Sequence, residues 1–416
     1  VGANNLNTLD PIGQFGTRLQ GGKDAAQSRY IFTKLNSLTR KLFNENDDVL
    51  CNYLDDDGQS IEPDYYYPIL PNAVINGSDG IGTGYSTSIP MCNPKTIATY
   101  IKAKIEGEET PEIKPWYRGF KGKIESTSKG SYITRGCYKI IDSGTIVITE
   151  LPVGKWTEDY TDFLDKVSVE RGKETAKNFV RSYVDNSTED KIHIEVDINP
   201  VILSKWANKI GKDGVPEIEN KLKLTSSVST SNITAFDENN IITKFSNIED
   251  LIDRWFAVRK GIYSKRRDYL LAKLKNELDI IKFRVQFIEE IIEDKRVINK
   301  KKKDVIIKEL EDSNYPKFSE KINGEPSYDY LIKMELLKLT YEEIEKLKSQ
   351  RDKKQLEYDT LFGKSDTDLW KEDIEDFVES WDKSLLEYEK EHSGNVEIKK
   401  KTKIRRKKIS SKKKKA

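Results

Sequence analysis

The chain has 416 residues, enough for two to four domains with ample core. Charged residues make up 34% of it and hydrophobic residues only 36%, which predicts an elongated molecule with much solvated helix surface. The net charge is +1, but residues 399–416 hold 12 of the 71 basic residues and no acids, so the remainder carries 59 basic against 70 acidic residues. This balance excludes a uniformly basic nucleic-acid-binding domain, and no apolar run approaches the roughly 18 residues of a membrane span.

The cysteines indicate the cellular compartment, and the N-terminal residues indicate whether the chain begins at a natural start. Cys51, Cys92 and Cys137 are widely spaced and form no CxxC pair, which predicts reduced thiols in an intracellular protein and no structural zinc. The chain begins at Val1 without a methionine, a basic region or an apolar region. We therefore expect that it begins inside a longer polypeptide.

Residues 1–68 open with glycine-rich turns. Asp24 is a fair helix N-cap, and the apolar residues after it recur at helical spacing, so we expect a helix over residues 25–42. Residues 69–245 mix helical and strand patterns, and residues 144–150 and 191–197 alternate at period two. This pattern predicts an α+β domain.

Residues 246–295 change to a continuous helical pattern. Such a helix would be roughly 70 Å long, which suits one arm of a coiled coil. A second helix begins at Thr340 with Glu343 as its capping box, ends before Gly363, and is the natural antiparallel partner. We expect a globular cap over residues 296–339, a further short helix from Asp366, and a basic tail over residues 393–416 that cannot fold alone.

The pair Arg29-Tyr30 is a candidate for attack on a phosphodiester, and the residues around it support that interpretation. A tyrosine phenolate can attack a phosphodiester and keep the bond energy in a phosphotyrosine ester, and an adjacent arginine can stabilise the phosphoryl charge. Tyr30 alone is one of 20 tyrosines. The run from Gly13 to Leu35, however, resembles the active-site segment of eukaryotic-type topoisomerase II. The resemblance implies a winged-helix domain with Tyr30 as nucleophile, Arg29 as its phosphate partner, and Arg18 and Lys23 near the DNA backbone.

A second motif spans residues 68–87. Its glycines allow close backbone approach, but it is not a P-loop, because Thr83 stands where a lysine is required. The segment resembles the same family's junction between winged helix and tower, where an isoleucine wedges into the duplex and kinks it. Ile81 matches that isoleucine. The alternative is a structural glycine turn with Ile81 in the core.

Further resemblances follow in the family's order, so that they cover nearly all of residues 1–392. Trp156 fits the tower, and residues 328–340 and 364–373 resemble the C-terminal gate. The implied fold is multidomain α+β. It has a partial winged helix at 1–68, a mixed α/β tower at 69–245, a long antiparallel coiled coil with a helical C-gate at 246–392, and the tail.

Several patterns do not predict a metal or catalytic site. Asp55-Asp56-Asp57 imitates a DxD motif but lies in a polar run that ends at Gly58, which predicts a solvated turn. His193 and His392 have no ligand partner nearby in the sequence. We expect no metal site in this chain. In the family, Mg²⁺ and ATP are bound by TOPRIM and ATPase regions, so the isolated chain should bind DNA without cleaving it.

The resemblance implies ATP-dependent double-strand passage by a homodimer acting on double-stranded DNA, in the nucleus or, for a viral protein, in a virus factory or virion. The sequence leaves two alternatives, a non-catalytic SMC-like coiled-coil scaffold and a topoisomerase that has lost its catalytic role. The basic tail suits a nuclear localisation signal and a DNA contact equally.

Overall fold

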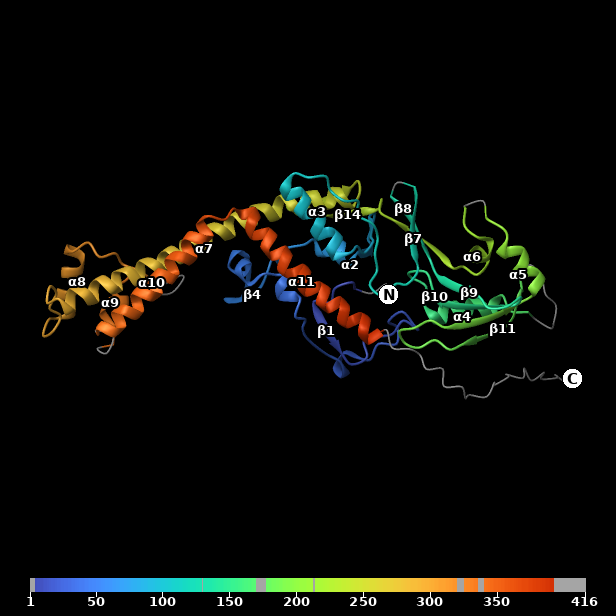
Figure 1. The fold of residues 1–416 in the computed structure, drawn as a ribbon, viewed down its shortest axis with the longest axis horizontal. Helices are drawn as coiled ribbons and strands as arrows, with labels where there is room; N and C mark the ends of the chain where they lie inside the picture. The colour runs from blue at the N-terminus through green and yellow to red at the C-terminus, as the bar shows by residue number, and fades with distance from the viewer. Residues whose placement is uncertain are drawn as a thin grey trace.

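The computed structural model describes residues 4–128, 130–169, 177–211, 214–319, 325–335 and 340–392. The molecule is elongated, with a helical arm at one end, a body rich in strands at the other, and a central body between them (Figure 1). Among the described residues, no helix combines the length and apolarity that a bilayer crossing requires. The expected mixed α/β character is confirmed.

The central body contains residues 4–117, residues 233–263 and the last helix. Its strands are β1 (Leu9–Ile12), β2 (Phe32–Leu35), β3 (Tyr53–Asp56), β4 (Gln59–Pro63), β5 (Ser78–Ile81), β6 (Ser86–Ile89), β14 (Ile233–Phe236) and β15 (Ile242–Phe245), paired as antiparallel hairpins in chain order. Its helical segments are η1 (Ser28–Tyr30), α1 (Thr39–Leu42), η2 (Glu45–Leu50), α2 (Asn72–Asn76) and α3 (Pro94–Glu106). One apolar core joins them and includes Leu6, Ile69, Ile97 and Trp370.

The helix expected over residues 25–42 is wrong. Residues 28–30 form a single 3₁₀ turn, β2 pairs antiparallel with β1 from Leu9↔Leu35 to Ile12↔Phe32, and only residues 39–42 are α-helical. The run Ile-Phe-Thr has high strand propensity, and pairing with a partner strand outweighs an apolar spacing that happens to match a helix.

The sheet body comprises the described residues between 123 and 229. A four-stranded antiparallel sheet has the order β11-β12-β10-β9, and a three-stranded sheet has the order β13-β8-β7. The strands are β7 (Lys123–Ser128), β8 (Ser131–Arg135), β9 (Cys137–Ile140), β10 (Thr145–Glu150), β11 (Val180–Asp185), β12 (Ile194–Ile198) and β13 (Thr225–Ser229). The helices are α4 (Thr157–Lys166), α5 (Pro200–Ala207) and α6 (Glu217–Lys221). Both expected strands are confirmed as β10 and β12, which pair with each other, and their inward side chains form a separate core.

The helical arm is built from α7 (Ile248–Ile292) beyond Tyr263 and from α10 (Tyr341–Phe362), both of which were expected. Lys348 pairs with Glu289 at 2.7 Å and Lys354 with Glu277 at 2.9 Å, so the two helices run antiparallel. The Thr340 hydroxyl accepts from the Glu343 backbone N–H, the bond expected of that cap. At the tip, α8 (Lys303–Asp312) and α9 (Asp329–Ile332) close a third apolar cluster with α7.

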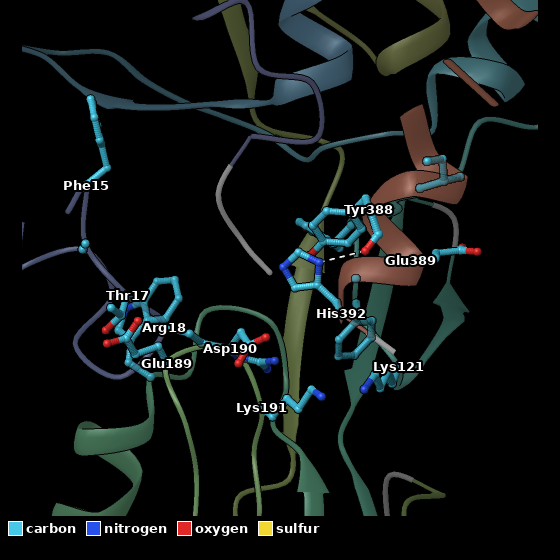
Figure 2. A pocket seen from close by; sticks show the side chains of 18 of the residues that line it. Phe15, Thr17, Arg18, Lys121, Glu189, Asp190, Lys191, Tyr388, Glu389 and His392 are labelled. Carbon is cyan, nitrogen blue, oxygen red and sulfur yellow. Dashed lines mark hydrogen bonds between the residues drawn. The ribbon is translucent and has the colours of Figure 1, made fainter. Parts of the chain in front are cut away.

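The final helix, α11 (Asp366–His392), has 27 residues, so the short helix expected here is in fact long. It returns to the central body, where Trp370 is buried and its indole N–H donates to the Ile69 carbonyl at 3.0 Å. Its last turns bring Tyr388 and His392 to a cavity that also borders on the segment of Thr17 and Arg18 (Figure 2). Residues 364–373 therefore pack at the base of the arm, far along α7 from its tip.

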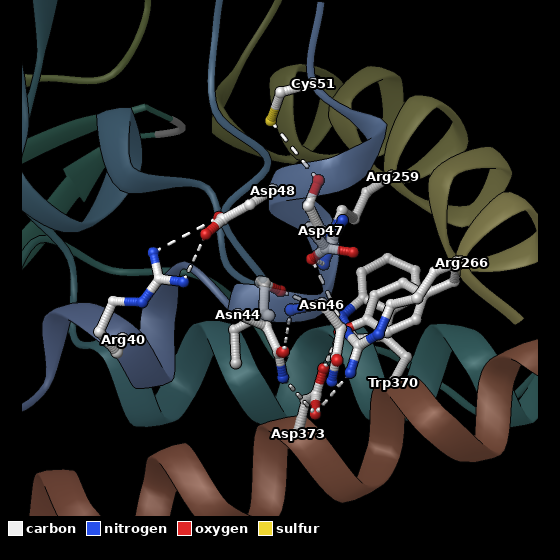
Figure 3. Close-up of polar contacts among 12 residues, drawn as sticks. Arg40, Asn44, Asn46, Asp47, Asp48, Cys51, Arg259, Arg266, Trp370 and Asp373 are labelled. Carbon is white, nitrogen blue, oxygen red and sulfur yellow. Dashed lines mark hydrogen bonds and ion pairs between the residues drawn. The ribbon is translucent and has the colours of Figure 1, made fainter. Parts of the chain in front are cut away.

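A buried cluster of charges joins three segments at that base (Figure 3). Arg259 of α7 donates to Asp47 of η2 at 2.6 Å, and Arg266 bonds to Asp373 of α11 at 2.6 Å while lying 3.7 Å from Asp47. These four side chains are at most 16% exposed. Tyr263 also donates to Asp373 at 2.7 Å, and burial raises the pKa of its hydroxyl well above the usual range. Two positive and two negative charges thus balance away from water.

Asp47→Asn should be strongly destabilising, because it leaves two buried arginines sharing one carboxylate. We expect the free energy of unfolding to fall by about 3–5 kcal/mol. The matched control is Asp48→Asn, since Asp48 pairs with Arg40 at 2.7 Å on the surface and its loss should cost about 1 kcal/mol or less. Urea denaturation of both variants measures the difference, and equal effects would contradict the balance of charges described here.

Candidate active site and nucleic-acid interface

Residues 13–27, the glycine loop, form a closed turn that leads into η1. The loop is closed at its base by a hydrogen bond from the Ala26 N–H to the Gln14 carbonyl at 2.9 Å. Gly16 has φ +102°, and a Cβ there would lie 2.5 Å from the Cα of Gly22, so the two sides of the loop meet closely because residue 16 is glycine. This compact loop determines where the chain emerges at Tyr30.

Tyr30 lies at the end of η1 with its side chain toward solvent. The residue is 63% exposed, and no described residue hydrogen-bonds its hydroxyl. The Arg29 guanidinium lies 4.9 Å from the centre of the Tyr30 ring. An accessible tyrosine side chain whose ring lies against a guanidinium offers two features that suit attack on a phosphodiester, an open approach and a positive charge nearby.

The two other basic residues singled out from the sequence differ in their surroundings. Lys23 is exposed at the outer edge of the glycine loop. Arg18 forms an ion pair with Glu150 of β10, and the side chains are only 8% and 2% exposed. In this arrangement Arg18 does not face a phosphate, because its charge is paired inside the protein. The DNA-backbone contact expected of it from the sequence stays a prediction.

Ile81 is at the end of β5, next to the turn of the β5–β6 hairpin. Gly77 enters the hairpin with φ +68°, and a Cβ there would lie 2.5 Å from the Ile89 carbonyl oxygen. At the turn, the Gly82 N–H donates to the Tyr85 carbonyl at 2.8 Å. Ile81 is 96% exposed, so the alternative that places it in the core is wrong. A fully exposed isoleucine on a hairpin tip is an apolar group available to a partner.

The remaining polar patterns have structural explanations. Asp55-Asp56-Asp57 lies in the β3–β4 hairpin, where Asp57 and Gly58 have positive φ, so the expected solvated turn is confirmed. His193 lies 3.2 Å from Glu195, and His392 bonds to the Tyr388 carbonyl and stacks on its ring. Within the described residues, no three His, Cys, Asp or Glu side chains gather as a metal site would require. The three cysteines are free.

Sequence reasoning missed the contacts that surround the glycine loop. The loop borders a cavity of about 1090 Å³ whose other walls are Trp116–Lys121, the Glu189–Lys191 turn and the end of α11. Glu150 was a detectable signal, since it continues the buried face of β10 after Ile146 and Ile148. An acid at an inward position of a strand requires a buried partner, although its identity is not contained in the pattern.

Comparisons with known proteins agree with this geometry. The family model for the DNA gyrase/topoisomerase IV A subunits matches residues 1–375. DNA topoisomerase 2 of Penicillium chrysogenum is 37% identical over 92% of this chain and 25% of its own length, and that of Acanthamoeba polyphaga mimivirus is 37% identical over 92% and 34%. The chain therefore spans about a quarter to a third of these relatives.

A solved structure is similar as well. The DNA-binding, cleavage and re-ligation domain of Plasmodium falciparum topoisomerase II is 38% identical, with a TM-score of 0.81 over 95% of this chain and 55% of that one. Sequence and fold thus agree over almost the whole chain, which belongs to the family of the DNA gyrase/topoisomerase IV A subunits and has the type II topoisomerases of eukaryotes and a large virus among its relatives.

Proposed function

We propose that this chain is the breakage–reunion and C-gate part of an ATP-dependent type II DNA topoisomerase, with Tyr30 as the nucleophile. The observation that carries the proposal is the exposed Tyr30 hydroxyl beside Arg29 at the end of the glycine loop. The Plasmodium structure is described as a DNA-binding, cleavage and re-ligation domain, which supports the same assignment. The substrate would be double-stranded DNA.

In this proposal, the Tyr30 oxygen forms a bond to a backbone phosphorus as the bond from phosphorus to the 3′ oxygen breaks. The 5′ end stays attached to the tyrosine, the proton leaves the phenol, and a 3′ hydroxyl is released. Attack by that hydroxyl reverses the reaction without ATP. Arg29 would stabilise the phosphoryl charge, and Lys23 would contact the backbone nearby. Ile81 would wedge between base pairs and bend the duplex.

Mg²⁺ would stabilise the leaving oxygen in the whole enzyme. The described residues of this chain do not fit such an ion, since they hold no cluster of three possible ligands. As the family resemblance implies, Mg²⁺ and ATP would be bound by TOPRIM and ATPase regions outside this chain. Two nucleophiles are needed for two strands, so the active form would be a homodimer. Its location would be the nucleus, or a virus factory or virion if the protein is viral.

The bodies of the fold correspond in this proposal to the family's parts. Residues 1–68 would be a partial winged helix, residues 69–245 the tower, and residues 246–392 the coiled coil with its C-gate, formed by the tip of the arm. The basic tail, residues 393–416, lies outside the described residues. A non-catalytic scaffold is the second candidate, and the exposure of Tyr30 favours the catalytic one.

Covalent capture tests the nucleophile. The chain, combined with its TOPRIM and ATPase regions, Mg²⁺ and duplex DNA, should yield after denaturation and digestion a peptide that carries a 5′-phosphonucleotide on Tyr30. Tyr30→Phe should abolish the adduct because it removes the attacking oxygen. The control is Tyr85→Phe, which alters a residue of similar exposure, 57%, and should keep the adduct. Mass spectrometry identifies the modified residue, and an adduct on another tyrosine, or DNA binding with no adduct at all, would refute the assignment.

Ile81→Ala should reduce DNA bending without abolishing binding. Burying an isoleucine side chain is worth about 1.5–3 kcal/mol, so its truncation should lower the ratio of bent to straight duplex by about ten- to a hundredfold. Fluorescence energy transfer between the two ends of a short duplex measures this. Ile141→Ala, at a residue 62% exposed in the sheet body, is the matched control and should leave the bend unchanged. Equal bending by the Ile81 variant and the parent would mean that Ile81 does not intercalate.

A further inference from the structure

The glycine loop caps a helix of the sheet body. The first N–H groups of any α-helix have no partner within the helix. At the start of α4, the Thr157 N–H donates to the Arg18 carbonyl at 3.4 Å and the Glu158 N–H to the Leu19 carbonyl at 3.0 Å. The N-cap residue, Trp156, makes no side-chain cap bond, so the loop supplies the acceptors instead. Loop and helix therefore hold each other in place.

The Arg18–Glu150 ion pair lies at the centre of this contact. Glu150 also accepts the Lys121 N–H at 3.2 Å and the Leu151 N–H at 2.9 Å, which fix its carboxylate on β10. The Arg18 N–H donates to the Glu189 carbonyl at 3.2 Å, and Figure 2 shows the two residues on the same side of the cavity. Arg18 is thus tied to the sheet body by its side chain, its N–H and its carbonyl.

The rest of the loop transmits this attachment to Tyr30. Asp24 accepts from the Thr17 N–H at 2.8 Å and from its hydroxyl at 2.5 Å, and these bonds hold the pKa of the Asp24 carboxyl below its ordinary value. Gly21 packs so closely on Trp156 that a Cβ there would overlap the indole ring. Successive backbone hydrogen bonds stabilise the chain between Arg18 and Tyr30. The last of them is donated by the Tyr30 N–H to the Gln27 carbonyl.

We propose that Arg18 is a positioning residue for the cleavage reaction. Through its ion pair with Glu150, Arg18 fixes the position of Tyr30 relative to the sheet body, and it does not contact DNA. This inference rests on the proposed function. The alternative role, a direct phosphate contact, makes opposite predictions about salt. The slope of log K against log [salt] is negative, and each phosphate contact that is lost reduces its magnitude, here called the salt slope, by about 0.9. A lost positioning contact leaves the salt slope unchanged.

The test uses the chain with its TOPRIM and ATPase regions, Mg²⁺ and one short duplex. Arg18→Met should slow adduct formation at saturating DNA about ten- to a hundredfold, because a misplaced nucleophile loses rate and not affinity. Its DNA affinity and salt slope should match those of the parent. Arg18→Lys, which keeps the charge, should recover part of the rate. Lys23→Met is the control for a phosphate contact and should lower the salt slope.

Glu150→Gln alone leaves Arg18 buried without a carboxylate, so it is compared with the Arg18→Met/Glu150→Gln double variant, which removes both charges. If the two residues act as one unit, the double variant should be no slower than Arg18→Met. A lower salt slope in Arg18→Met, an unchanged adduct rate, or additive losses in the double variant would each overturn the inference.

Failure of the proposed function has a different signature, the absence of any adduct from the parent enzyme. Hydrogen exchange then decides the positioning claim by itself. Amides of residues 26–31 should exchange faster in Arg18→Met than in the parent, and equal exchange would overturn the claim.

Discussion

The attachment of the arm depends on two arginines that face two carboxylates away from water at the base of α7. Buried charges of this kind are tolerated only where their partners and geometry are fixed, because a single unpaired charge in such a place is very costly. Asp47 comes from η2, Arg259 and Arg266 from α7, and Asp373 from α11. Three segments that are distant in the sequence must therefore meet before all four of these charges are paired.

The sequence indicates those parts of the fold whose causes are local. The stripe of apolar residues in α7, the Thr340 cap of α10 and the alternation in β10 each follow from side-chain periodicity or from one short-range hydrogen bond. The helix expected at 25–42 failed because β1, more than 20 residues earlier in the chain, pairs with β2. The docking of α11 likewise depends on Ile69 and Tyr263, which no local pattern of residues 366–392 contains.

In the candidate site, too, local motifs identified the residues, whereas their long-range contacts could not be predicted. Tyr30, Arg29 and Ile81 were identified from motifs, and all three have exposed side chains, as residues that contact a partner should. Arg18 was identified from the same motif, but its partner is 132 residues further along the chain. A motif shows that a residue belongs to a site, whereas the contacts of its side chain decide whether it faces the substrate or supports the residue that does.

The arm is a hairpin fixed to the central body at both of its ends, and this has a mechanical consequence. A single helix bends readily under a sideways load, whereas two antiparallel helices that pack along each other, as α7 and α10 do, must bend together. A displacement of the tip is therefore carried to the base along α7 and along α10 with α11. Because Arg266 of α7 and Asp373 of α11 bond to each other there, a twist of the arm would act directly on this buried ion pair.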